Sequence, residues 1–250
     1  MKKVIDNFSI QAGTYKKFRP EYPKELYREI LSHSTKREEC WDCATGNGQV
    51  AKELSKYFNK VYASDISADQ IKLAAKKPNI EYLITRAEKT PFHDDQFDLI
   101  TVAQATHWFD FKAFNAEVKR VGKNSSKIII WGYGLLRIEK RIDEIIQDFY
   151  TNTIGAYWDK ERKHIDLHYE SIEFDFKELD SPKNLSIGAS WRLSHLIGYL
   201  NSWSSVQNYI KANGENPTIE IAQRLSNIWS EEEYKQINFP IFMRIGQIEK

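Results

Sequence analysis

The chain has 250 residues, 28% of them charged, and 36 Lys and Arg nearly balance 35 Asp and Glu at a formal net charge of +1. The charges are spread along the sequence, which argues against a nucleic-acid or anionic-membrane partner, because such partners need a concentrated basic patch. No segment approaches the run of about 18 apolar residues of a membrane span, and no apolar run follows the N-terminal lysines, so we expect a cytoplasmic protein.

The first half of the chain alternates apolar strands with amphipathic helices. Strands are predicted over residues 40–44, 61–65, 80–84, 97–103 and 127–131. Apolar residues at helical spacing predict helices over residues 26–31, 50–58, 68–77 and 111–121. Ser67 is a good N-cap for the third helix, and Pro78 ends it. Strands joined by helices of about ten residues indicate a parallel sheet that is covered on both faces.

The pattern changes after Gly134. A strong apolar stripe predicts a helix of about four turns over residues 138–150, and Phe174 and Phe176 alternate as in a strand. Asn216 and Pro217 form an N-cap and first-turn pair for a later helix. Residues 239–248 read as a final strand, in which Pro240 is tolerated only at the start. No internal repeat or linker is evident, so we predict a single domain over residues 1–250.

The two cysteines, Cys40 and Cys43, form a CxxC motif. The motif precedes a glycine-rich turn, and positions i and i+3 of a strand point to opposite faces, so we interpret both residues as strand packing. One CxxC also cannot fill a zinc shell. His164 and His168 have i, i+4 spacing without a third ligand, and we therefore expect no metal site.

Glycine residues mark the first turn from strand to helix. At Gly46 and Gly48 the absence of a side chain lets a ligand approach the backbone, and the helix start offers free N–H groups. Ala51 completes a GxGxxA pattern with Asp65 further on, so a dinucleotide-binding unit is one alternative. Asp42, within the preceding strand, favours a ligand with an ammonium group instead. The alternative role for Asp42 is to cap the helix turn.

Polar groups follow the next two strands. Asp65 ends the second strand, where its carboxylate can accept hydrogen bonds from both ribose hydroxyls; its alternative role is a helix N-cap beside Ser67. Ala87 and Glu88 follow the third strand and are candidates to meet an adenine ring, through a backbone N–H and a carboxylate respectively. Glu88 is equally well read as a solvated charge at a helix start.

Three segments together resemble a known family. Residues 41–51, the AEKTPF segment (87–92) and the FDLITVAQATHWFD segment (97–110) resemble the class I S-adenosylmethionine-dependent methyltransferases. They are most similar to the methyltransferase type 11 group, which includes trans-aconitate methyltransferases. The resemblance extends to the FRPEYP segment (18–23), to Trp203-Ser204 and to Phe239-Pro240, and so spans nearly the whole chain.

The resemblance implies a fold. A Rossmann-like, doubly wound α/β sheet of seven mainly parallel strands is expected, with the last strand antiparallel and helices on both faces. Residues 1–131 would form the cofactor-binding core, and residues of about 133–170 and 185–235 would form a helical cap.

The resemblance also implies a cofactor site for S-adenosylmethionine. Gly46 and Gly48 would line its methionine part, Asp65 would hold the ribose, and Ala87 with Glu88 the adenine. Ile66 is a further predicted cofactor-binding residue. Asp42 is part of the same predicted site, and Gln104 would lie near the transferable methyl group. Arg86 departs from the family, which often has an acidic residue before the alanine of the adenine loop.

Further residues are predicted at the acceptor end. Tyr15 and Arg19 are candidates to contact the cofactor. The Arg19 guanidinium could donate two hydrogen bonds to a carboxylate of the cofactor or of the substrate. The alternative is that the FRPEYP segment only latches the N-terminal helix over the site. His107 is a candidate general base, with bracing of the loop beside Trp108 as the alternative. Candidate aromatic contacts of the substrate are Trp108, Tyr133, Trp158 and Trp203.

The predicted function is in-line transfer of a methyl group from S-adenosylmethionine to a small-molecule acceptor, with a carboxylic acid suggested by the family and by Arg19. Two alternatives are an NAD-dependent Rossmann oxidoreductase and an S-adenosylmethionine-binding protein without catalysis. The acceptor atom, the need for a base and the oligomeric state, monomer or dimer, stay open at this point.

Overall fold

The structure is a computed structural model that describes residues 20–250. Its sheet has the strand order β3-β2-β1-β4-β5-β8-β6, with β7 paired to β8. The strands are β1 (Glu39–Cys43), β2 (Lys60–Asp65), β3 (Ile80–Ile84), β4 (Phe97–Ala103), β5 (Gly122–Tyr133), β6 (Lys177–Leu179), β7 (Ser186–Trp191) and β8 (Lys235–Gln247). Neighbours among β1 to β5 are parallel, whereas β8 is antiparallel to β5.

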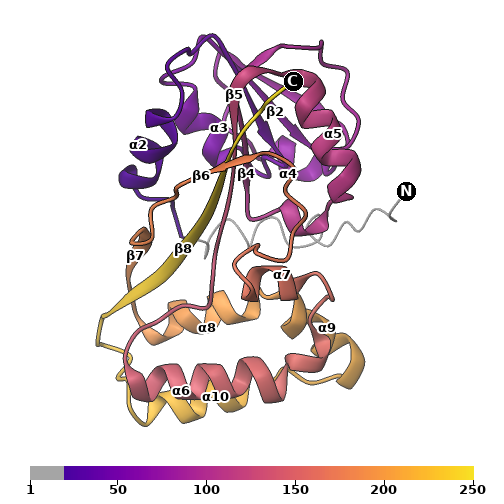
Figure 1. The fold of residues 1–250 in the computed structure, drawn as a ribbon. Coiled ribbons are helices and arrows are strands. Elements are labelled where there is room, and N and C mark those ends of the chain that lie inside the picture. The colour runs from indigo at the N-terminus through magenta and orange to yellow at the C-terminus, as the bar shows by residue number, and fades with distance from the viewer. Residues whose placement is uncertain (1–19) are drawn as a thin grey trace.

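Helices cover both faces of this sheet and extend beyond one end of it (Figure 1). They are α2 (Lys24–Ser32), α3 (Gln49–Leu54), α4 (Ala68–Lys72), α5 (Phe111–Val121), α6 (Lys140–Asp148), α7 (Arg162–Asp166), α8 (Leu193–Asn201), α9 (Ser204–Asn213) and α10 (Thr218–Ser226). Apolar side chains of α2 and α3 share one core with Cys40, and those of α5 share the core of the opposite face with Trp41 and Cys43. The expected Rossmann-like α/β sheet is thereby confirmed.

The sheet departs from the expected seven strands because it has eight. Both β6 and β7 lie along the same side of β8, where they pair with its C-terminal and N-terminal parts respectively. Phe174 and Phe176 were expected to form a strand, but β6 begins only at Lys177. The two rings instead pack edge to face over β8, where a Cβ on Gly246 would lie 2.6 Å from the Cβ of Phe176.

Pro240 lies inside β8, not at its start as expected. The pairing of β7 with β8 ends at Pro240, and the pairing of β5 begins at Ile241. The Pro240 carbonyl still accepts a hydrogen bond from the N–H of Gly134. The Pro240 nitrogen faces the β5 side, where regular pairing with β5 stops at Ile241 and resumes only as a bridge between Arg137 and Asn238, so no regular rung requires the missing N–H.

The helix expected over residues 68–77 is also shorter than its apolar pattern suggests. Ser67 caps it as predicted, since the hydroxyl accepts from the N–H of Gln70 at 3.3 Å. The last turn then tightens into i→i−3 bonds at Leu73 and Ala74, and the Tyr82 hydroxyl donates to the Ala75 carbonyl at 2.8 Å. A side chain from β3 thus takes the place of further helical hydrogen bonds.

The helices after β5 gather beyond the sheet. Figure 1 shows α6, α8 and α10 side by side below it, with α7 and α9 at one end of this group. Ile146 of α6, Leu200 of α8 and Leu225 of α10 belong to the same core as residues of β5 and β8. Within residues 20–250, no helix is long and apolar enough to cross a membrane.

Candidate functional site

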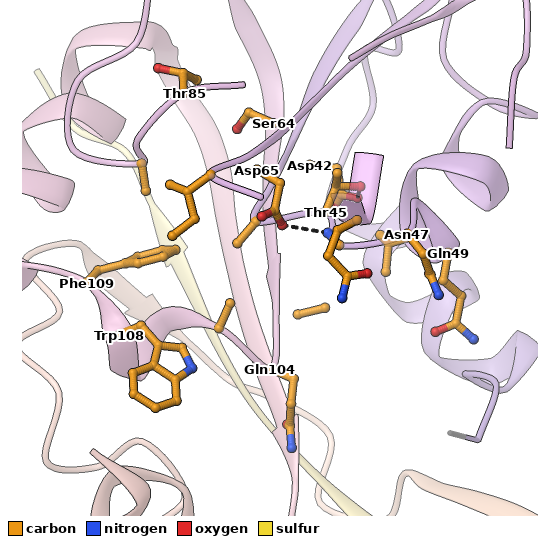
Figure 2. A pocket seen from close by; sticks show the side chains of 18 of the residues that line it. Asp42, Thr45, Asn47, Gln49, Ser64, Asp65, Thr85, Gln104, Trp108 and Phe109 are labelled. Carbon is orange, nitrogen blue, oxygen red and sulfur yellow. Dashed lines mark hydrogen bonds between the residues drawn. The ribbon is translucent and has the colours of Figure 1, made fainter. Parts of the chain in front are cut away.

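One pocket lies at the carboxyl ends of the parallel strands (Figure 2). Nine predicted site residues line it: Asp42, Gly46, Asp65, Ile66, Ala87, Glu88, Gln104, Trp108 and Tyr133. Gly48, His107, Trp158 and Trp203 are not among its lining residues. Tyr15 and Arg19 lie outside the described residues. The structure therefore brings together groups from the ends of β1, β2, β4 and β5 and from the loop after β3.

The two glycines of the first loop have different surroundings. Both adopt left-handed backbone angles, with φ of +56° at Gly46 and +76° at Gly48. A Cβ on Gly46 would find no atom nearer than Gln70 Oε1 at 4.0 Å, so the backbone here faces open space. A Cβ on Gly48 would lie 2.6 Å from the Tyr82 hydroxyl. Gly46 thus exposes the backbone to the pocket, whereas Gly48 lets the start of α3 pack against β3.

The carboxylate of Asp65 is held by backbone groups at the end of β2. Oδ2 accepts from the N–H of Gly46 at 2.8 Å, drawn as the dashed line in Figure 2, and Oδ1 accepts from the N–H of Ser67 at 2.9 Å. These two bonds fix the orientation of the carboxylate at the edge of the pocket and tie the glycine loop to β2.

Asp42 is buried beneath the same loop, with a side chain only 1% exposed. Oδ2 accepts from the Thr45 hydroxyl at 2.5 Å and from the N–H of Ala51 at 3.0 Å, while Oδ1 accepts from the Thr101 hydroxyl at 3.0 Å. Burial raises the pKa of Asp42 to about 6, although these hydrogen bonds oppose the shift. Asp42 thus performs the alternative role named for it, since it satisfies a free N–H in the first turns of α3, and it also borders the pocket.

The loop after β3 brings Ala87 and Glu88 to the pocket. The Glu88 side chain is 13% exposed, so it is not a solvated charge. Its Oε1 accepts from the N–H of Asp110 at 3.1 Å, and its Oε2 accepts from Arg86 Nε at 3.2 Å. Asp110 is the N-cap of α5, so Glu88 fastens the loop to the start of that helix.

Gln104 follows β4 in a strained conformation, with φ of +56°. Its Oε1 accepts from the N–H of Tyr133 at 2.8 Å, and its Nε2 donates to the Tyr133 carbonyl at 3.2 Å. A Cβ on Gly132 would lie 2.6 Å from Gln104 Oε1, so glycine makes room for this amide. Strain of this kind costs about 1 to 3 kcal/mol and is common at functional sites.

His107 lies behind the pocket wall. It is 4% exposed, and its Nδ1 is 3.1 Å from the Tyr169 hydroxyl. The ring centroid lies 4.9 Å from that of Trp108, which does line the pocket. This arrangement favours the bracing role over the role of a general base.

Trp158 and Trp203 belong to the helical part of the chain. Their ring centroids are 5.5 Å apart, and each also packs against Tyr150. The Arg162 guanidinium lies over the Trp158 ring at 4.6 Å. These two tryptophans form an aromatic cluster of their own, separate from the lining of the described pocket.

The CxxC cysteines are structural, as interpreted from the sequence. Cys40 and Cys43 are free and buried, and they lie in the cores on opposite faces of the sheet. Burial raises the pKa of both thiols, which keeps them protonated and unreactive. Among residues 20–250 there is no group of three or more His, Cys, Asp or Glu side chains that could hold a metal ion.

Several lining residues were not predicted individually. They include Pro20, Tyr22, Ala44, Thr45, Asn47, Gln49, Val50, Ser64, Gln70, Thr85, Arg86, Ala103, Ala105 and Phe109. Most are chain neighbours of predicted residues, so a wider window around each strand end would have included them. Gln70 differs from these residues, because it is not next to a predicted residue in the chain. It is a buried residue of α4 and approaches the glycine loop from that helix.

Comparisons with known proteins identify the family of this chain. The family model described as "Methyltransferase domain" matches residues 41–130. A Dictyostelium discoideum protein named as a methyltransferase is 38% identical over 255 residues, which cover 99% of this chain and 97% of the relative.

Solved structures show the same relationship. The structure of an Anaeromyxobacter dehalogenans protein named as a type II methyltransferase is 33% identical, with a TM-score of 0.86, and the match covers 93% of this chain and 99% of that one. The structure of a Bacillus halodurans protein named as a methyltransferase is 19% identical, with a TM-score of 0.54. The match covers 91% of this chain and 100% of that one, and it supports the fold alone. The chain therefore belongs to the class I S-adenosylmethionine-dependent methyltransferases, and S-adenosylmethionine is its cofactor.

Proposed function

We propose that the described pocket binds S-adenosylmethionine and that the chain transfers the methyl group to a small-molecule acceptor, with a carboxylic acid as the acceptor class. The observation that carries the site assignment is the contact between Gly46 and Asp65. An open left-handed glycine and an oriented carboxylate lie within one hydrogen bond of each other at adjacent strand ends. A nucleoside with a polar tail needs both features at this distance.

The charges that line the pocket fit a cationic ligand. Asp42, Asp65 and Glu88 are acidic, whereas Arg86 is the one basic residue among the described lining and is paired with Glu88. S-adenosylmethionine carries a sulfonium and an ammonium group, and an acidic lining favours both. Gly46 is the proposed contact of the methionine part. Gly48 supports it by giving the loop its shape.

The proposed ribose and adenine contacts follow the next two strand ends. Asp65 would accept from the ribose hydroxyls with its remaining lone pairs. Ile66 is 41% exposed beside it and, with Ala87, offers apolar surface to a flat ring. The N–H of Ala87 and the carboxylate of Glu88 are the proposed polar contacts of the adenine. Glu88 is already oriented by Asp110 and Arg86.

The acceptor would enter beside Gln104, Trp108 and Tyr133. Tyr22 lines the same pocket and meets the Tyr133 ring at a centroid distance of 6.4 Å. Aromatic faces favour a nearby sulfonium cation. Pro20 also lines the pocket directly after Arg19 in sequence, which supports the proposal that Tyr15 and Arg19 contact a carboxylate of cofactor or substrate.

When bound, S-adenosylmethionine supplies a methyl group that its sulfonium has already activated for in-line displacement. The residues of this chain then need chiefly to position the acceptor, and positioning can lower a barrier by about 7 to 11 kcal/mol. Histidine is absent from the described lining residues. A carboxylate acceptor is nucleophilic without a general base, and the resemblance to trans-aconitate methyltransferases suggests the same acceptor class.

We assign the choice of acceptor to the helical cap over residues 133–170 and 185–235. Helices α6 and α7 fall within the first range and α8 to α10 within the second. Residues of α6, α8, α9 and α10 share one core with the sheet, whereas Ile165 of α7 packs in the core of the opposite face. Fold alone does not determine an acceptor. The cap and the cofactor core are therefore proposed to act as one unit over residues 1–250.

A labelling screen tests this proposal. The chain is incubated with methyl-labelled S-adenosylmethionine and a panel of small carboxylic acids, with amines, phenols and thiols as contrasts. We expect incorporation into a carboxylic acid as a methyl ester. Incorporation only into the other classes would contradict the acceptor class, and tight cofactor binding without incorporation into any of them would support a binding protein without catalysis.

A further inference from the structure

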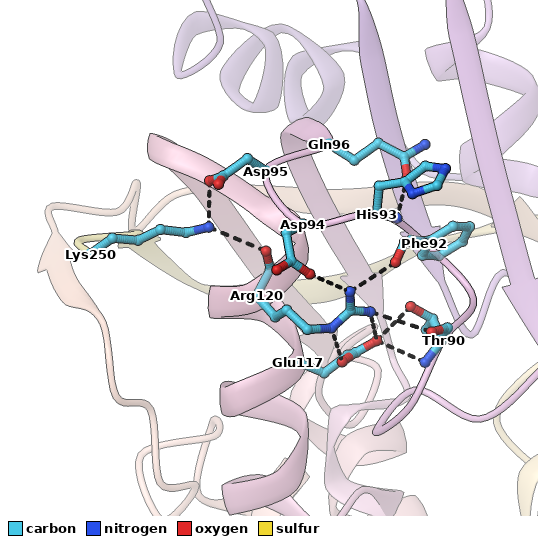
Figure 3. Close-up of polar contacts among 9 residues, drawn as sticks. All are labelled: Thr90, Phe92, His93, Asp94, Asp95, Gln96, Glu117, Arg120 and Lys250. Atoms are coloured by element: carbon cyan, nitrogen blue, oxygen red, sulfur yellow. Dashed lines mark hydrogen bonds and ion pairs between the residues drawn. The ribbon is translucent and has the colours of Figure 1, made fainter.

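An ion pair on α5 holds the loop that carries the proposed adenine contacts (Figure 3). We infer that Glu117 and Arg120 are positioning residues that fix the loop of residues 85–94 and thereby set the affinity and base selectivity of the cofactor site. This inference rests on the proposed function of that loop. Neither residue lines the pocket, so their effect must pass through the loop.

The carboxylate of Glu117 binds the loop directly at Thr90. Its side chain is 8% exposed, and Oε1 accepts from both the N–H of Thr90 at 2.7 Å and the Thr90 hydroxyl at 2.5 Å. Arg120 completes a two-pronged pair, with Nη2 at 2.7 Å from Oε1 and Nε at 2.9 Å from Oε2. Burial raises the pKa of Glu117, but the hydrogen bonds from Arg120 and Thr90 outweigh it, so the pKa is lowered overall.

Arg120 extends the same arrangement along the loop. Its Nη2 donates to the Thr90 carbonyl at 3.3 Å, and its Nη1 donates to the Phe92 carbonyl at 2.8 Å and to Asp94 Oδ1 at 2.7 Å. The planar guanidinium therefore contacts three alternating positions, 90, 92 and 94, of the chain that leads from the pocket back to β4. A lysine ammonium cannot reproduce this rigid fork.

The held residues adjoin the pocket directly. Ala87 and Glu88 line it, and Thr90 follows them after a single residue. The loop is also closed on itself, since the Thr85 hydroxyl donates to the Lys89 carbonyl at 3.2 Å.

Helix α5 therefore holds this short span at both of its ends. At its start, the N–H of Asp110 donates to Glu88. Two turns later, Glu117 and Arg120 hold Thr90. The N–H of Ala87 directly precedes this span in the chain, so its position depends on how firmly residues 88–90 are held, and loosening either attachment frees the span to move.

Asp94 provides a matched control. It contacts the same guanidinium, but its side chain is 71% exposed, and the hydrogen bonds to Thr90 come from Glu117 and Arg120. Exposed ion pairs contribute little, because solvent screens them and their side chains lose entropy. Asp94→Asn therefore removes one charge from the cluster and leaves the hold on Thr90 intact.

The test compares Glu117→Gln, Arg120→Lys and Asp94→Asn with the parent chain by calorimetric titration. The probes are S-adenosylhomocysteine and its hypoxanthine analogue S-inosylhomocysteine. Hypoxanthine replaces the acceptor nitrogen by N–H and the amino donor by a carbonyl, so it mismatches both the Ala87 N–H and the Glu88 carboxylate. The ratio of the two dissociation constants reports the position of the loop, and general instability does not change this ratio.

We expect Glu117→Gln and Arg120→Lys to weaken S-adenosylhomocysteine binding by about fivefold to thirtyfold and to reduce the preference over the inosyl analogue. Asp94→Asn should stay within about twofold of the parent. Thr90→Val removes only the hydroxyl contact with Glu117 and replaces Glu117→Gln or Arg120→Lys if either of them does not fold. It should weaken S-adenosylhomocysteine binding and reduce the base preference in the same direction, but by less.

Parental affinity and parental base preference in folded Glu117→Gln and Thr90→Val would overturn the inference. Weaker binding of both nucleosides by the same factor would also overturn it, because that result indicates a general loss of structure. If the parent itself binds neither probe, the proposed cofactor site fails, and this outcome is distinct from a failure of the α5 ion pair.

Discussion

The N–H of Gly46 donates a 2.8 Å hydrogen bond to the carboxylate of Asp65. The bond joins the loop after β1 to the end of β2, two strands paired in parallel with Cys43 beside Ser64. Its consequence is that the proposed contacts of the methionine part and of the ribose are already held together by the fold. Little ordering of these groups is needed when the cofactor binds.

Asp65→Ala is expected to weaken S-adenosylhomocysteine binding by about 1 to 3 kcal/mol, because charge-assisted hydrogen bonds to the ribose are lost together with the hold on Gly46. Titration calorimetry measures the change. Asp69→Ala is the control, since Asp69 lies on α4, shortly after Asp65 in the chain, and pairs with the exposed Lys72. Equal affinities for the two variants would remove Asp65 from the site.

Gly46→Ala and Gly48→Ala should have different effects although both residues have positive φ. Each substitution costs roughly 1 to 2 kcal/mol of backbone strain. At Gly48 the new Cβ would also approach the Tyr82 hydroxyl to 2.6 Å, so this variant should lose more free energy of unfolding. At Gly46 the Cβ would enter the open space above the loop, so Gly46→Ala should lose more cofactor affinity relative to its loss of stability. Denaturant unfolding and calorimetry on both variants check this, and the reverse order would contradict the assigned roles.

Asp42 predicts a specific pH dependence of stability. Its pKa is raised from 3.8 to about 6 by burial, so between these pH values the folded chain binds more protons than the unfolded chain. The contribution of Asp42 to the free energy of unfolding therefore falls as the pH rises from about 4 to about 6 and is constant above that range. Asp42→Asn lacks this titration. Its stability relative to the parent should rise across the same window in denaturant unfolding, and a parallel pH dependence of the two proteins would contradict the raised pKa.

His107 is expected to act by bracing Trp108. His107→Gln should lower kcat for any acceptor that the chain methylates without changing the shape of the kcat profile against pH. Tyr169→Phe removes the hydroxyl that lies 3.1 Å from His107 Nδ1 and should have a similar effect, with the double variant little worse than either single one. A titrating limb that disappears in His107→Gln but persists in Tyr169→Phe would restore His107 as the general base.

The parallel half of the sheet could be predicted from sequence because its signals are local. Apolar segments that alternate with helices predict strands β1 to β5 and their parallel pairing. The number of strands could not be predicted in this way. The pairing of β6 and β7 with β8 depends on contacts such as Phe176 against Gly246, which are distant in sequence.

The candidate site shows the same division. The strand ends indicated Asp65 and Gly46, since the carboxyl edge of a parallel sheet collects such residues, and the family resemblance indicated Gln104. All three line the described pocket. Sequence could not show that Gly48 faces Tyr82 or that His107 faces Tyr169, because both depend on tertiary packing. The contacts of Arg120 with the loop of residues 85–94 could not be predicted from the sequence, since an Arg three residues after a Glu is typical of any solvated helix.

The central claim is that the pocket lined by Gly46 and Asp65 binds S-adenosylmethionine. Its most direct test is a calorimetric titration of the chain with S-adenosylhomocysteine and, in parallel, with NADH, each repeated on Asp65→Ala. We predict saturable binding of the sulfur nucleoside, loss of affinity in the variant and no binding of NADH. Preferred binding of NADH, or binding of S-adenosylhomocysteine that Asp65→Ala leaves unchanged, would contradict the claim.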